Sequence, residues 1–130
     1  MRRLVHILTL EQFQKLSEKH DQELECYCEY SEFLTWQNYV QLPNQFRSHG
    51  HFDHKEEALD GNFRIEYHPN GTNYGSKDAP IAVNYYPYNI SEIHECLNCH
   101  AVFLTYVEID YHSPQNKVKY VSSQLIDGTP

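Results

Sequence analysis

Four cysteines occur as two closely spaced pairs, and this spacing indicates metal chemistry in the 130-residue chain. One pair is Cys-x-Cys at residues 26–28 and the other is Cys-x-x-Cys at residues 96–99. Thiolates suit Zn²⁺, which prefers four tetrahedral ligands, and each spacing lets two sulfurs reach one ion. In a reducing compartment such pairs more often bind metal than form disulfides. We therefore predict a structural zinc site whose ligands are Cys26, Cys28, Cys96 and Cys99.

Other interpretations of the cysteines stay open. In one alternative, His94 or His100, which flank the second pair, replaces one cysteine as a zinc ligand. In another, the four thiols are reduced, partly buried and free of metal. A redox centre is disfavoured, because its thiolate normally lies at a helix N-terminus and the residues after Cys99 have strand character.

A second group of potential metal ligands lies at residues 48–54, which are Ser-His-Gly-His-Phe-Asp-His. The pattern resembles the metal-binding signature of the metallo-β-lactamase superfamily, in which zinc activates water. The resemblance implies a metal-dependent hydrolase that uses His49, His51, Asp53 and His54. The composition favours a solvated polar loop instead, because nine histidines in 130 residues readily cluster by chance.

The charge balance is acidic, with 10 basic against 18 acidic residues and a net charge of −8. Recognition of nucleic-acid phosphates or of an anionic membrane surface calls for a basic face, so neither partner is expected. The acidic residues either solubilise the surface or complement a basic protein partner. They cluster at Glu23, Glu25, Glu29 and Glu32, at Asp53, Glu56, Glu57 and Asp60, and at Glu92 and Glu95.

The elements that must position these residues follow from periodicity and turn signals. A capping box at Thr9–Gln12 starts a helix over about residues 10–20, and a second helix or helical turn is expected between Tyr30 and Val40. Residues 43–61 are polar and predict a long loop. Strands are expected at residues 63–67, 81–88, 90–95 and 101–109. A turn at residues 112–116 then leads into a last strand from Val118 to Ile126.

This pattern predicts one domain, residues 1–130, of the α+β class. N-terminal helices pack on a small antiparallel sheet that carries a zinc-ribbon-like knuckle at residues 96–99. Tyr-, Asn- and Gly-rich segments at 69–75 and 85–88 have the composition of contact surfaces. The short apolar stretch at residues 4–10 is unlike a secretory signal, and no apolar run is long enough to span a membrane. We therefore expect a cytoplasmic protein.

Several segments together resemble the small bacterial immunity proteins that accompany polymorphic or contact-dependent toxins. These segments are residues 26–36 (CYCEYSEFLTW), 69–74 (PNGTNY), 78–82 (DAPIA), 96–100 (CLNCH) and 102–107. The resemblance implies a cytosolic, non-enzymatic antitoxin that binds one cognate toxin and blocks it. The acidic, Tyr-rich composition suits a basic, nuclease-type toxin. The alternatives are the metal-dependent hydrolase described above and a zinc-ribbon adaptor protein.

Overall fold

The computed structural model describes residues 7–18, 35–52, 79–84, 87–97, 99–109 and 113–128. Within these ranges the protein has a single α-helix and a mostly antiparallel sheet, which confirms the α+β class. The prediction of several N-terminal helices is wrong for this part of the chain, which contains one. No helix in the described ranges is long and apolar enough to cross a membrane.

Helix α1 spans Leu10–Glu18 and begins at the predicted capping box. The Thr9 amide donates to the Gln12 side-chain oxygen over 3.0 Å, and the Gln12 amide donates to the Thr9 hydroxyl over 3.2 Å. These two bonds satisfy amides that have no partner inside the helix. Phe13 and Leu16 on the apolar stripe are buried, as the helical spacing predicts.

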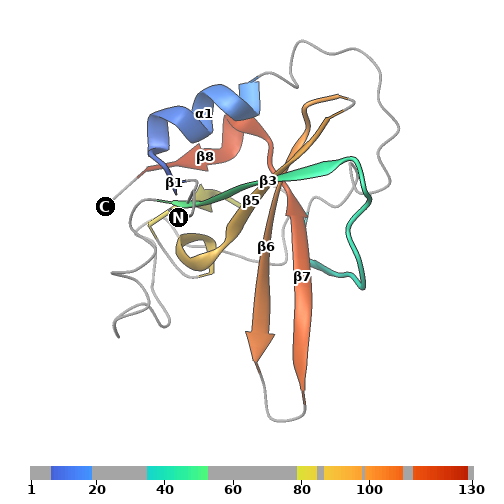
Figure 1. The fold of residues 1–130 in the computed structure, drawn as a ribbon. Coiled ribbons are helices and arrows are strands. Elements are labelled where there is room, and N and C mark those ends of the chain that lie inside the picture. Colours follow the sequence, from blue (N-terminus) through green and yellow to red (C-terminus); the bar gives the residue numbers. More distant parts are fainter. Residues whose placement is uncertain are drawn as a thin grey trace, which may run out of the picture.

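The main sheet contains six strands in the described residues. These are β1 (Ile7–Leu8), β2 (Gln37–Asn38), β3 (Phe46–Phe52), β5 (Glu92–Cys96), β6 (Val102–Ile109) and β7 (Pro114–Tyr120). Their order is β1-β3-β5-β6-β7-β2, with β1 parallel to β3 and all other neighbours antiparallel (Figure 1). A separate parallel pair joins β4 (Ile81–Ala82) to β8 (Ile126–Asp127). The 3-10 helices η3 (Tyr88–Ile90) and η4 (Ser123–Leu125) come just before β5 and β8.

The sheet has two faces with different coverings. We call the face that packs against α1 the helix face, and it carries Ile93 and Glu95 of β5 together with their β6 partners Leu104 and Val102. Figure 1 shows α1 on one side of the sheet, next to β8. The core on this side is formed by Phe13, Leu16, Phe52, Ile81, Ala82, Val83, Tyr88, Ile93, Val102, Leu104 and Val121.

We call the opposite side the pocket face, and it carries Glu92, His94 and Cys96 of β5. A second, smaller core lies on this face around Phe103 and Cys96. Tyr39 and Leu42, between β2 and β3, and Phe46, the first residue of β3, pack against it. The ring of Phe46 stacks on that of Phe103 with centroids 4.8 Å apart.

Several predicted elements differ from the structure. Residues 46–52, expected within a loop, form β3, which pairs with β5 over most of its length. Residues 37–38, expected near the end of a second helix, form β2. The predicted turn at 112–116 is wrong in part, because β7 begins at Pro114 and pairs with Ile109. Strand 101–109 is confirmed as β6, while the predicted strand 63–67 lies outside the described residues.

Candidate functional site

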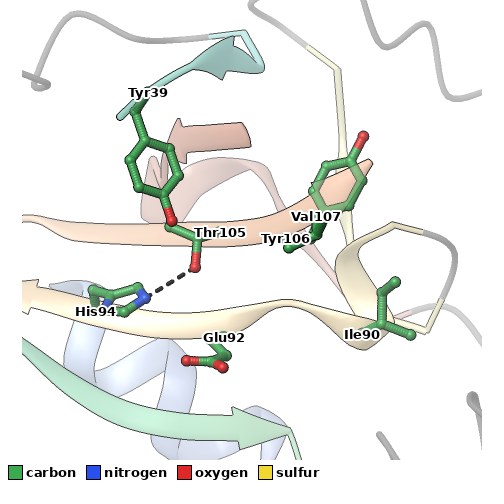
Figure 2. A pocket seen from close by; sticks show the side chains of 7 residues that line it. All are labelled: Tyr39, Ile90, Glu92, His94, Thr105, Tyr106 and Val107. Carbon is green, nitrogen blue, oxygen red and sulfur yellow. Dashed lines mark hydrogen bonds between the residues drawn. The ribbon is translucent and has the colours of Figure 1, made fainter. Parts of the chain in front are cut away.

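A pocket of about 220 Å³ opens on the pocket face between β5, β6 and the segment that follows β2 (Figure 2). Four of its side chains are polar and able to bond a ligand, and three supply apolar or aromatic surface. The lining residues are Tyr39, Ile90, Glu92, His94, Thr105, Tyr106 and Val107. It is therefore a small concave site with convergent polar groups, the kind of groups that fix the orientation of a ligand.

Strand geometry places the polar groups together. Glu92 and His94 are two residues apart on β5, so their side chains leave the same face. Thr105 on β6 pairs directly with Glu92, so it shares that face. Tyr39 follows β2, and its amide donates to the Asn116 carbonyl over 3.0 Å, which fixes the position of its backbone against β7.

Two of these side chains are hydrogen-bonded to each other, and a third lies beside them. His94 Nε2 lies 2.9 Å from the Thr105 hydroxyl oxygen, and the Tyr39 side chain lies next to Thr105. Figure 2 shows the Tyr39 hydroxyl directed toward Thr105 and Thr105 directed toward His94. His94 and Thr105 are buried. The polar end of the pocket therefore brings together a phenol, a hydroxyl and an imidazole, and the last two are hydrogen-bonded.

The environment sets the charges in the pocket. Burial lowers the pKa of His94 below its usual value, while the Glu92 carboxylate acts in the opposite direction. Burial also raises the pKa of Tyr39, the neighbouring Thr105 hydroxyl lowers it, and Glu92 raises it again. At neutral pH the imidazole and the phenol are therefore uncharged, and the exposed Glu92 supplies the only charge among the seven lining residues.

A second polar cluster lies on the helix face and centres on the buried carboxylate of Glu95. His49 Nε2 lies 2.7 Å from one carboxylate oxygen, and His100 Nδ1 lies 2.7 Å from the other. The Glu95 side chain is 5% exposed, against 18% for His49 and 37% for His100. An ionised carboxylate only accepts hydrogen bonds, so opposite it each ring donates from the named nitrogen.

Local backbone features bring both imidazoles to Glu95. The pairing of β3 with β5 is irregular between Ser48 and Gly50, which leaves His49 as an extra residue at a β-bulge. Gly50 has a φ of 87°, a conformation that favours glycine. His100 ends the β5–β6 turn with a φ of 68°, a region that non-glycine residues rarely adopt.

The predicted cysteine site is described for one of its two pairs. Cys96 and Cys99 are unoxidised and buried at 0% and 1% exposure, at the turn between β5 and β6. The His100 amide donates to the Cys96 carbonyl over 2.7 Å and closes this turn. Cys26 and Cys28 lie outside the described residues. No group of three or more potential metal ligands occurs in the described ranges.

The flanking histidines bond to oxygen atoms of other residues. His94, proposed as an alternative zinc ligand, bonds to Thr105, and His100 bonds to Glu95. The two described histidines of the predicted hydrolase motif, His49 and His51, also have different partners. His49 contacts Glu95, whereas His51 donates from Nδ1 to the Phe52 carbonyl over 2.8 Å. Asp53 and His54, which would complete the motif, lie outside the described residues.

The acidic surface is described only in part. The clusters predicted at residues 23–32 and 53–60 lie outside the described ranges, as do the Tyr-rich residues 69–75 and 85–86. Glu92 is exposed, as expected of a surface group. Glu95 was expected to contribute to the acidic surface and is buried at 4% exposure, so that expectation is wrong. Its two imidazole partners compensate the burial of the carboxylate.

Sequence reasoning missed Tyr39 and Thr105 as site residues. For Thr105 the sequence contained a signal. Thr105 lies on the same strand face as Phe103 and Val107, and it is the polar residue in this apolar run. No comparable signal marks Tyr39, which reaches the site only because β2 pairs with β7.

Comparisons of this chain with protein-family models, with curated proteins and with solved structures find no match.

Proposed function

We propose that this protein is a cytosolic immunity protein that binds and neutralises a cognate bacterial toxin, a basic effector of nuclease type. The observation that carries the proposal is the net charge of −8 in a chain with 11 tyrosines. Opposite potentials speed association and reject wrong partners. Tyrosine adds rigid contact area with a polar tip, which is the composition of many binding surfaces.

The described surface supports this proposal at the pocket face. There the exposed Glu92 lies beside Tyr39 and Thr105, so a negative charge and hydrogen-bonding groups converge on one concave spot. Such a spot can anchor a protruding basic side chain, and anchors of this kind carry much of the binding energy of an interface. Glu95 takes no direct part in this surface, because it is buried against two imidazoles.

We further propose that Zn²⁺ supports this fold through Cys26, Cys28, Cys96 and Cys99, in a zinc-ribbon-like arrangement. Support comes from the second pair, whose two thiols lie buried at one tight turn between antiparallel strands. Buried thiols close together in the chain are a suitable half of a zinc site. The metal would have a structural role, tying the N-terminal third to the β5–β6 turn.

Growth rescue tests the immunity function. The product of the neighbouring reading frame is expressed in a bacterial host, alone and together with the full-length protein. The proposal predicts growth arrest in the first case and restored growth in the second, with a stoichiometric complex recovered from the cells. A matched host that expresses an unrelated acidic protein of similar size controls for nonspecific charge effects. Arrest that persists despite normal levels of the full-length protein contradicts the proposal.

A further inference from the structure

The chemistry of the pocket face selects for a cation. Its lining combines one carboxylate with uncharged hydrogen-bonding groups, and none of the seven lining residues is Lys or Arg. The Glu92 side chain is exposed, and its carboxylate has no ion pair or hydrogen bond with another side chain in the described ranges. The exposed carboxylate can accept hydrogen bonds from a ligand. An anion would meet this carboxylate without a compensating positive charge.

The polar end supplies directional contacts beside that charge. The Tyr39 ring forms one wall, and the aromatic face attracts a planar cation. The hydroxyl oxygens of Tyr39 and Thr105 offer acceptor lone pairs at the same end. A group with several N–H donors in one plane can therefore bond the carboxylate and a hydroxyl at once while it contacts the ring.

The opposite end of the pocket is apolar. Ile90 precedes Glu92 and Val107 follows Thr105, each by two residues, so the pocket changes along the strands from polar to aliphatic. Val107 is 47% exposed, so its side chain can contact a ligand. This surface suits the methylene stem of a long basic side chain whose charged head reaches the carboxylate.

We propose that the Tyr39–Glu92–Thr105 pocket binds a guanidinium group carried on an aliphatic stem, and that its source is an arginine side chain of the basic protein partner. Arginine fits better than lysine because the planar guanidinium can bond a carboxylate with two parallel N–H groups and stack on tyrosine. The proposal that the pocket binds a guanidinium group depends only on the lining residues and their positions. The assignment of that group to an arginine of a toxin rests on the proposed function.

A direct titration tests the pocket. The full-length, ¹⁵N-labelled protein is titrated with N-acetyl-arginine-methylamide and followed by the amide resonances of Glu92, His94 and Thr105. The neutral isostere N-acetyl-citrulline-methylamide and the lysine analogue serve as controls. We expect saturable shifts with a Kd of about 1 mM for the arginine probe, weaker binding of the lysine analogue and none of the citrulline analogue. Equal shifts with citrulline, or no shifts with arginine, overturn the proposal.

Paired substitutions locate the binding site. Glu92→Gln should weaken binding roughly tenfold, the loss expected of one charge-assisted contact. Glu11→Gln on α1 removes the same charge away from the pocket and should leave the Kd unchanged. Tyr39→Leu should weaken binding about threefold more than Tyr39→Phe, because only leucine removes the ring. Equal effects of Glu92→Gln and Glu11→Gln overturn the site, since bulk charge then explains the binding.

The partner is tested separately. In the growth-rescue experiment, Glu92→Gln should reduce protection while Glu11→Gln retains it, and this result supports an arginine of the toxin as the natural occupant. Full protection by Glu92→Gln overturns that assignment while leaving the immunity function intact. Saturable binding of the arginine probe without any protection by the wild-type protein overturns the immunity function and leaves a pocket for a free guanidinium compound.

Discussion

Removal of the Glu95 carboxylate should destabilise the protein strongly. Glu95 is 5% exposed at its side chain and accepts two contacts of 2.7 Å, from His49 and His100. A hydrogen bond to a charged group contributes about 1.5–3 kcal/mol. Because the His100 side chain is 37% exposed, its contact is screened and counts less. We therefore expect Glu95→Ala to lower the free energy of unfolding by about 3 kcal/mol.

The amide substitution separates charge from hydrogen bonding. In Glu95→Gln the side chain keeps its shape and offers one acceptor and one donor group to the two imidazoles. One ring can switch tautomer to accept from the new amide, so both contacts survive without charge assistance. We expect a loss of about 1–2 kcal/mol, smaller than that of Glu95→Ala.

Urea denaturation at neutral pH, followed by far-ultraviolet circular dichroism, measures both variants. A loss of 3 kcal/mol is a large fraction of the roughly 5–15 kcal/mol that stabilises a domain. The control is Glu11→Ala, which removes an exposed carboxylate 3.8 Å from Lys15 and should cost at most about 0.5 kcal/mol. If Glu95→Ala were as stable as Glu11→Ala, the cluster around Glu95 would contribute no more than an exposed ion pair, contrary to this prediction.

Three further substitutions, at Lys119, His100 and Cys96, have expected effects on stability or metal content. The pKa of the buried Lys119 is lowered to about 8 by desolvation, so the folded state binds fewer protons than the unfolded state above that pH. Stability should therefore rise from pH 8 to about pH 9.5, and this slope should be absent in Lys119→Met. His100→Gly and His100→Ala both lose the contact with Glu95, so both should unfold at a lower urea concentration than the wild type. His100→Gly should be about 1 kcal/mol more stable than His100→Ala, because only glycine adopts the positive φ of residue 100 without strain. Cys96→Ser should lose the bound zinc that the proposed site predicts, measured by metal analysis of the tag-free protein; equal zinc in the wild type and variant would contradict that site.

Local signals predicted the elements that depend on nearby residues. The Thr9–Gln12 capping box correctly predicted α1, because both of its bonds join residues three apart. The apolar, β-branched run ending at Ile109 correctly predicted β6. Strand β3 was missed because its sequence, FRSHGHF, lacks alternating apolar residues. It is a strand through its pairing with β5, about 45 residues later, and this pairing has no local signature.

The same distinction applies to the site. Glu95 has the sequence context of an exposed glutamate, and its burial depends on His49, which is 46 positions earlier. His94 was noted as a possible zinc ligand from its position beside Cys96, but its contact is with Thr105 on the neighbouring strand. Tyr39 enters the pocket from a third segment. Contacts between side chains on different strands depend on how the strands are aligned. That alignment is weakly specified where a strand such as β3 lacks alternating apolar residues.

Calorimetric titration of the full-length protein against the basic product of the neighbouring reading frame tests whether an acidic surface captures a basic toxin. We expect one toxin bound per molecule of this protein, with an affinity that falls between about 0.05 M and 0.5 M salt, because the exposed charges are increasingly screened. Glu92→Gln should bind more weakly than Glu11→Gln at the lower salt concentration. Absence of a complex, or an affinity that is the same at both salt concentrations, would contradict the claim that an acidic surface of this protein captures a basic toxin.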